Sequence, residues 1–185
     1  MSSADIAIER TRHWLERLVI GENLCPFAAA PYRAGRVLFR VCEAQALDGV
    51  YVDFLQLLQE LVDDAAGSWE TGILILTDAL SVFDDYLDGL EVMERAVSEA
   101  GLEGEFQVAS FHPQYCFDGV AADDPSNYSN RSPLPLFHLI RERELAAVLA
   151  GVDHPERIPQ RNIAHLRRLG IDGIRRLLAD PDRVP

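Results

Sequence analysis

The sequence contains no lysine, because all 17 of its basic residues are arginine. A chain without lysine cannot anchor pyridoxal phosphate, form a Schiff base, or use a phosphate-loop lysine or a serine–lysine nucleophile pair. The 30 acidic residues bring the formal net charge to -13, and a surface of this charge repels nucleic acid and anionic membranes. We therefore expect a small anionic ligand as partner, held in the arginine-rich residues 131–185, with no membrane contact and nucleic acid disfavoured.

Long apolar runs and paired cysteines are also missing. No stretch approaches the ~20 apolar residues of a membrane span, and the N-terminus lacks the apolar run of a signal peptide. Cys25, Cys42 and Cys116 are too few and too widely spaced for a disulfide framework. Glycine-rich phosphate loops and a G-x-S-x-G elbow are absent as well. We therefore expect a cytoplasmic protein without a cofactor, folded as a single domain over residues 1–185.

Three short segments have the patterns of β-strands. Residues 36–44 alternate between apolar and polar, as a half-solvated edge strand does, and residues 73–76 are apolar on both faces, as a central strand is. Residues 105–111 form the third. Helical segments separate them, which predicts a three-layer α/β fold with a mainly parallel three-stranded βαβαβ sheet. An α+β fold with a mixed sheet is the alternative.

Helical spacing is clear in the rest of the chain. The N-terminal helix over 4–20 places on one face Ala7, Thr11, Trp14 and Leu18. The helices between the strands are expected to bury Val52, Leu55, Leu58, Val62 and Ala65 in the first, and Phe83, Leu87, Leu90 and Val97 in the second. The C-terminal third is predicted to be helical over 134–150, 155–169 and 171–179, with breaks at Gly151 and Gly170.

The segment 112–133 has no periodicity and is longer than the ~12–15 residues beyond which loops are usually functional or disordered. Parallel strands would bring Glu43, Asp78 and His112 to one edge of the sheet, where ligands bind open α/β folds. His112 is the best candidate of the three, because the following proline holds it in extended geometry. The alternative is a histidine that only hydrogen-bonds the loop backbone.

A second candidate site runs from Asn130 to Arg141. Ser132 is a natural N-cap of the expected helix, so Arg131 would lie at a helix N-terminus that already favours anions. On such a helix His138 and Arg141 are neighbours, which predicts an anion site with an arginine clamp and a histidine base. The alternative is a solvated helix face with a surface Arg–Glu pair.

Cys25 precedes Pro26 and is the candidate nucleophile. A reactive thiol needs cationic neighbours that lower its pKa below ~8.5, whereas most cysteines are small buried hydrophobes, and both interpretations stay open. Zinc is a further alternative, because Cys25, His112, Cys116 and His138 are suitable ligand types. Their spacing lacks any paired element such as C-x-x-C, so we expect no metal.

The motifs IGENLCPFA (20–28), FHPQY (111–115) and DDPSNYSNRSPLPLFHLIRE (123–142) resemble those of a bacterial family of uncharacterised proteins with a domain of unknown function. The resemblance covers nearly the whole chain and implies no activity, substrate or cofactor. It marks as motif positions Cys25, His112, Tyr115, Asn130, Arg131, His138 and Arg141. Cys116 is not part of the motif.

Three functions are compatible with these features. The first is a hydrolase or transferase for a small anionic substrate, with His112, His138 and Cys25 as catalytic residues. Its ligand-binding residues would be Arg131, Asn130, Ser132, Arg141 and Tyr115. The second is a protein that binds the same anion without catalysis. The third and weakest is nucleic-acid binding by the arginine-rich C-terminal helices. The oligomeric state is not indicated.

Overall fold

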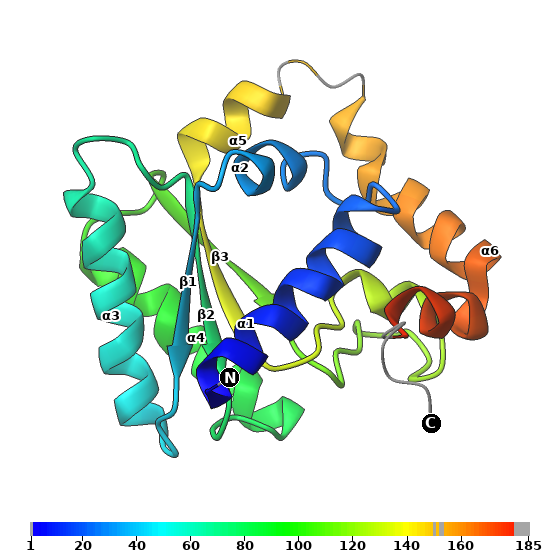
Figure 1. Ribbon diagram of the computed structural model, residues 1–185, viewed down its shortest axis with the longest axis horizontal. Helices are drawn as coiled ribbons and strands as arrows, with labels where there is room; N and C mark the ends of the chain where they lie inside the picture. The colour runs from blue at the N-terminus through cyan, green and yellow to red at the C-terminus, as the bar shows by residue number, and fades with distance from the viewer. Residues whose placement is uncertain (1, 150, 152–153, 180–185) are drawn as a thin grey trace.

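The computed structural model describes residues 2–149, 151 and 154–179. Its strands are β1 (Val37–Cys42), β2 (Thr71–Leu76), β3 (Phe106–Phe111) and β4 (Leu136–Arg141). Its helices are α1 (Ser3–Trp14), α2 (Ala29–Arg33), α3 (Leu47–Asp63), α4 (Phe83–Glu99), α5 (Glu142–Leu149) and α6 (Ile158–Leu178). A π-helical segment η1 (Leu15–Ile20) continues α1, and 3₁₀ turns occur at η2 (Pro125–Ser129) and η3 (Pro155–Arg157). Figure 1 shows helices on both sides of the sheet.

The sheet has four strands in the order β1-β2-β4-β3 and is mixed. β1 pairs in parallel with β2, whereas β4 is antiparallel to both of its neighbours. The α/β class, the three predicted strands and the edge position of β1 are confirmed. The mainly parallel three-stranded sheet is wrong, because β4 lies between β2 and β3. β2 nevertheless keeps an interior place and is buried along its whole length.

The predicted helix over 134–150 is wrong in its first half, where residues 136–141 form β4. Residue 150 lies outside the described part of the chain. Leu136 packs into the core on one face of the sheet and Phe137 and Leu139 into the core on the other. Both faces of β4 are covered, so the strand has apolar residues on both sides and lacks the alternation of polar and apolar residues that marks a half-exposed strand. From sequence alone, a short apolar run of this kind can be either a strand or part of a buried helix.

This correction removes the predicted helix N-terminus at Ser132. The Ser132 hydroxyl donates to the Leu134 carbonyl at 2.5 Å and caps no helix. The next helix, α5, begins ten positions later at Glu142. Without a helix over residues 133–141, the free N–H groups that were expected to attract an anion beside Arg131 are not there.

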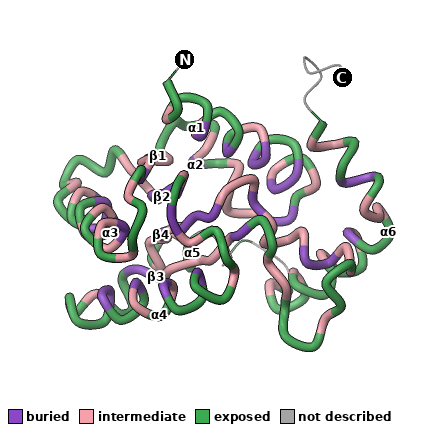
Figure 2. Tube along the Cα trace, turned by 90° about the horizontal axis from the view of Figure 1, so that it is seen from below, coloured by how far each residue is buried: buried purple, intermediate pink, exposed green. Residues whose placement is uncertain are grey.

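Helices α3 and α4 cover one face of the sheet. The residues that α3 buries are Val50, Phe54, Leu57, Leu58 and Leu61. The predicted burial of Leu58, and of Val97 in α4, is confirmed, whereas the predicted burial of Val52, Val62 and Leu87 is wrong. Val52 is 52% exposed, and in α4 Leu87 is 39% exposed while Tyr86 is fully buried. Each helix is turned so that its large aromatic residue, Phe54 or Tyr86, enters the core, which removes more apolar surface from water than the expected face would. Figure 2 shows the buried stretches facing the strands.

The other face is covered by α1 and η1, and α6 packs on η1 and η2. Ala7, Thr11, Trp14 and Leu18 are all buried, as predicted. The π-helical segment η1 is followed by Gly21, where a Cβ atom would lie 2.6 Å from the Arg17 carbonyl oxygen, so a side chain does not fit there without a shift of the backbone. The predicted break at Gly170 is confirmed by a φ of 69° inside α6. In the described part of the chain, no helix is long and apolar enough to cross a membrane.

Candidate functional site

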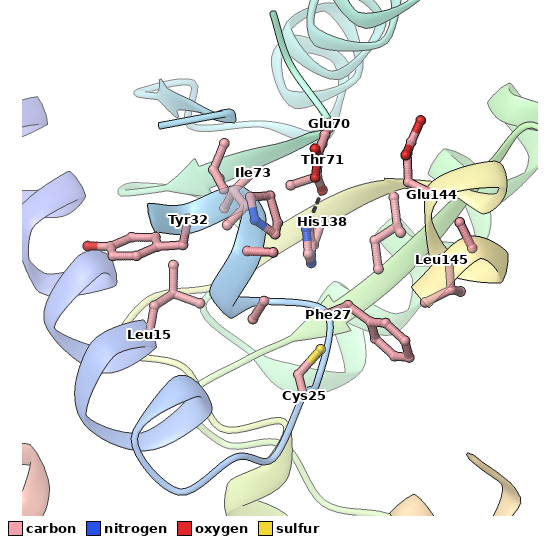
Figure 3. Close-up of a pocket in the computed structure, with 16 residues that line it drawn as sticks. Leu15, Cys25, Phe27, Tyr32, Glu70, Thr71, Ile73, His138, Glu144 and Leu145 are labelled. Carbon is pink, nitrogen blue, oxygen red and sulfur yellow. Dashed lines mark hydrogen bonds between the residues drawn. The ribbon is translucent and has the colours of Figure 1, made fainter. Parts of the chain in front are cut away.

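A cavity of about 200 Å³ lies on the α1–α6 side of the sheet, and we call it the inner cavity. Its walls come from separate parts of the chain and are mainly apolar (Figure 3); they include Leu15, Phe27, Val37, Ile73, Ile140 and Leu145. Cys25 and His138, two of the three predicted catalytic residues, line it together. They are 113 positions apart in the sequence. The fold therefore brings together a thiol and an imidazole in a mostly apolar space.

His138 enters the cavity because it lies on the same face of β4 as Leu136 and opposite Ile73 of β2. Its Nε2 atom lies 2.5 Å from the Thr71 hydroxyl, and that hydroxyl donates to the Leu139 carbonyl at 2.6 Å. A carbonyl oxygen only accepts, so the Thr71 proton points to Leu139 and Nε2 must carry the proton donated to Thr71. The other ring nitrogen, Nδ1, then keeps a free lone pair.

Burial lowers the pKa of His138 to about 4. The cause is desolvation, which disfavours the charged imidazolium. Part of the ring stays accessible, and this surface faces the inner cavity. At neutral pH the side chain is therefore a neutral imidazole of fixed tautomer, able to accept a proton or a hydrogen bond through Nδ1.

Cys25 lies in the turn between η1 and α2, and its sulfur points into the inner cavity towards His138 (Figure 3). Burial raises the pKa of the Cys25 thiol, while the backbone N–H groups of Phe27 and Ala28 act in the opposite direction and offset part of the effect. The pKa of Cys25 is thus not lowered, as we expected for a reactive thiol. Desolvation outweighs the backbone N–H groups, and the described residues that line the inner cavity include no cationic side chain.

The charged groups of the inner cavity are acidic. Glu70 and Glu144 line it, and each is paired with an arginine, Glu70 with Arg36 and Glu144 with Arg143. Among the described lining residues there is no arginine. Transfer of an anion from water into a mainly apolar cavity costs free energy when no unpaired cation receives it, so the wall of this cavity favours a neutral ligand over the anionic one expected from the sequence.

His112 lies at the carboxyl end of β3, away from the inner cavity. Its Nδ1 accepts from the Gln114 backbone N–H at 3.0 Å, which leaves Nε2 as the donor to the Leu80 carbonyl at 3.2 Å. The ring is 1% exposed and packs against Phe83 and Tyr86. Burial also lowers the pKa of His112. Both nitrogens are occupied by backbone groups, which favours the alternative interpretation of this residue.

Arg131 holds the segment 112–133 together. Its guanidinium donates to the carbonyl oxygens of Tyr115 at 2.9 Å and Ala122 at 2.7 Å, and it lies 5.2 Å from the Tyr128 ring centroid. Asn130 has a similar role, because its side-chain amide donates to the Ser110 carbonyl at 3.0 Å. These contacts explain how a long segment without regular structure stays ordered.

Arg141 is on the opposite face of the sheet from His138. Its guanidinium donates to the Leu61 carbonyl at the end of α3 and lies 4.9 Å from the Phe106 ring centroid. Arg131 precedes β4, whereas Arg141 ends it, so the strand separates the two guanidinium groups. The predicted clamp of Arg131 and Arg141 around one anion, with His138 between them, is therefore wrong.

A second cavity of about 570 Å³ lies between the segment 112–133 and α6, and we call it the outer cavity. Its wall combines apolar residues, such as Phe117 and Ile163, with polar ones, such as Ser129 and Asn130. Arg167 also lines it, and its charge is paired with Asp124 at 2.8 Å. Cys25 lines both cavities and thus lies between them.

A metal centre has little support in this arrangement. In residues 2–149, 151 and 154–179, no group of three or more histidine, cysteine, aspartate or glutamate side chains is placed to hold an ion. The Cys116 thiol donates to the Val120 carbonyl at 3.3 Å.

Comparison with known proteins gives one match. The model of a family described as "Protein of unknown function (DUF1415)" matches residues 6–176. The chain belongs to this family. No curated protein and no solved structure matches it. The family resemblance expected from the Cys25, His112 and His138 motifs is thereby confirmed.

In this family member, sequence reasoning missed Thr71, which fixes the tautomer of His138. Thr71 is an ordinary first residue of a strand when the sequence is considered alone. Its role depends on the antiparallel pairing of β2 with β4, which brings together residues 67 positions apart. Prediction of β4 as a strand would have been the only signal, since a strand at 136–141 places His138 on the face opposite Phe137 and Leu139.

Proposed function

We propose that this protein is a thiol-dependent acyl-transfer enzyme, a hydrolase or a transferase, in which Cys25 is the nucleophile and His138 the general base. The observation that carries this proposal is the free Nδ1 lone pair of His138 in the cavity that holds the Cys25 sulfur. A nucleophile, a base and a third group that orients the base are the elements of nucleophilic catalysis, and Thr71 is the orienting group.

The reaction uses only proton transfers and acyl transfer. Cys25 Sγ forms a bond to the carbonyl carbon of an ester or related substrate, and the thiol proton passes to His138 Nδ1. The bond to the leaving group then breaks, and Nδ1 returns this proton to the leaving oxygen. Water or a second alcohol attacks the resulting thioester, and its proton passes through His138 to the departing sulfur.

The resting site holds two neutral groups. The pKa of Cys25 is raised and that of His138 is about 4, so proton transfer between these two groups alone is unfavourable. Proton transfer must therefore accompany attack on a bound carbonyl. The backbone N–H groups of Phe27 and Ala28 support this step, because they favour negative charge on the sulfur.

The substrate supported by the cavity is neutral and partly apolar. The wall is mainly apolar, and its two carboxylates, Glu70 and Glu144, are paired with Arg36 and Arg143, so the described lining offers an anion no free cationic partner. This replaces the anionic substrate of the sequence-based hypothesis. Arg131 and Arg141 have no part in the proposed reaction.

A second candidate is a binding protein without catalysis. The raised pKa of Cys25 favours it, because a thiol in apolar surroundings is usually inert. In this case the inner cavity would hold a small apolar molecule with one hydrogen-bond donor directed at His138 Nδ1.

The test is incubation with p-nitrophenyl acetate, followed by release of p-nitrophenol and by mass spectrometry of the protein. We expect an acetyl group on Cys25 and turnover that Cys25→Ser abolishes. His138→Gln should lower kcat by about 10²-fold or more, the usual contribution of a general base. Thr71→Val should lower kcat less, because it releases the tautomer but keeps the imidazole.

Cys116→Ser is the matched control, since Cys116 is also partly buried but lies outside the inner cavity. This variant should keep the wild-type rate. Turnover that persists in Cys25→Ser would contradict the proposed nucleophile. Unmodified Cys25, together with stabilisation of the protein by small neutral apolar molecules, would support the binding protein instead.

A further inference from the structure

The two cavities on either side of Cys25 differ in size, chemistry and access to the base. The inner cavity of about 200 Å³ is mainly apolar and contains His138. The outer cavity of about 570 Å³ has both apolar and polar walls, and His138 is not among its described lining residues. Cys25 contributes to both walls, and its sulfur points into the inner cavity, so the two substituents of a carbonyl carbon bound to this sulfur can be divided between the two cavities.

The position of His138 decides which substituent lies where. His138 must reach the leaving oxygen of the substrate, because it returns the proton to that oxygen. The water or alcohol that attacks the thioester must also lie beside His138, because it passes its proton to the imidazole. The leaving oxygen therefore lies in the inner cavity. The acyl group exchanges no proton and does not need His138, so the outer cavity is left for it.

Resting on the proposed function, we infer that the substrate is a neutral ester or related acyl compound with a large acyl group, held in the outer cavity, and a small leaving group, held in the inner cavity. A volume of about 570 Å³ lies in the usual range of ligand pockets, roughly 300–1,000 Å³, whereas about 200 Å³ lies below it.

The walls of the outer cavity indicate the character of the acyl group. Phe111, Phe117 and Ile163 suit an apolar chain or ring, and Ser129 and Asn130 suit a polar substituent on it. The charge of Arg167 is balanced by its two-point pair with Asp124, so it does not call for an anionic group. The acyl group expected here is therefore large, mainly apolar and uncharged.

The experiment is a series of p-nitrophenyl esters, acetate, butyrate, octanoate and dodecanoate, which keep one leaving group and lengthen the acyl chain. We expect kcat/KM to rise with chain length, by at most about fourfold per buried methylene group, until the outer cavity is filled. Val120→Trp, which fills the outer cavity from the loop, should flatten this dependence. Ile163→Trp fills it from α6 and provides a second test if the first variant does not fold.

Ala28→Leu is the matched control, because Ala28 lines only the inner cavity. It should lower kcat/KM for all four esters and leave the slope against chain length unchanged. A flat chain-length series in the wild type would overturn the assignment, as would a slope that Ala28→Leu flattens and the outer-cavity variants do not. In both cases acylated Cys25 would show that the proposed function holds. If no ester acylates Cys25, the proposed function and this assignment both fail.

Discussion

The protonation state of His138 makes a measurable contribution to stability. Its pKa is about 4 in the folded protein against an ordinary value of 6.5. Below pH 6.5 His138 is protonated in the unfolded chain, whereas in the folded protein it stays neutral down to about pH 4. Stability is therefore lost as the pH falls through this window, by about 1.4 kcal/mol per unit and about 3 kcal/mol in total.

The test compares wild type with His138→Phe, which keeps a ring in the cavity wall and removes the titrating group. Urea unfolding is followed by circular dichroism at several pH values from 7.5 to 4. The difference in unfolding free energy between the two proteins removes contributions shared by both, including those of His112 and the carboxylates. We expect the wild type to lose about 3 kcal/mol relative to the variant over this range.

Thr71→Val is the control, because it removes the hydrogen bond to Nε2 but leaves the imidazole buried. Burial is the cause of the lowered pKa, so the unfolding free energy of this variant should depend on pH as that of the wild type does. At every pH it should be lower by about 1–3 kcal/mol, because the Nε2–H group is left buried without an acceptor. A difference between wild type and His138→Phe that does not change with pH would refute the reasoning. The imidazole of His138 would then be hydrated in the folded protein.

Three further predictions concern other parts of the molecule. Gly21→Ala should destabilise the protein by about 1–3 kcal/mol in urea unfolding, because the new Cβ atom meets the Arg17 carbonyl oxygen at 2.6 Å. Gly21 has helical φ and ψ, where alanine without such a clash is the more stable residue, so an unchanged or increased stability of the variant would contradict the steric argument. Iodoacetamide should modify the partly buried Cys116 fastest and Cys25 more slowly, because the pKa of Cys25 is raised. The fully buried Cys42 should react slowest, because its pKa is about 12. A reaction rate of Cys25 that reaches its plateau below pH 8 would contradict this order. Elemental analysis of untagged protein should give less than stoichiometric zinc, whereas one zinc per chain that Cys25→Ser removes would establish a metal site.

The pattern of the sequence determined much of the α/β fold. Residues with a single strong local signal gave correct predictions: the edge strand at Val37–Cys42, the buried strand at Thr71–Leu76 and the helix break at Gly170. Ser2 and Asp5 form a capping box at the start of α1, with the three-residue spacing that such a box requires. Local signals succeed where the conformation depends on neighbours in the chain.

The candidate site was only partly accessible from the sequence. Cys25 and His138 could be selected as reactive residue types in family motifs, but their meeting in one cavity depends on β4. That segment is apolar on both faces, and its helix-like spacing of His138 and Arg141 was a coincidence. The pairing energy that decides for a strand comes from β2 and β3, which are distant in sequence.

Only the tertiary structure decided the charge and the roles of the individual side chains. Burial sets the neutral state of His138 and Cys25, and backbone partners occupy both nitrogens of His112. The same is true of Arg131, whose guanidinium binds loop carbonyl groups and not a ligand. Sequence determines which chemical groups a chain can offer, whereas desolvation and hydrogen bonding depend on what the folded chain places around them.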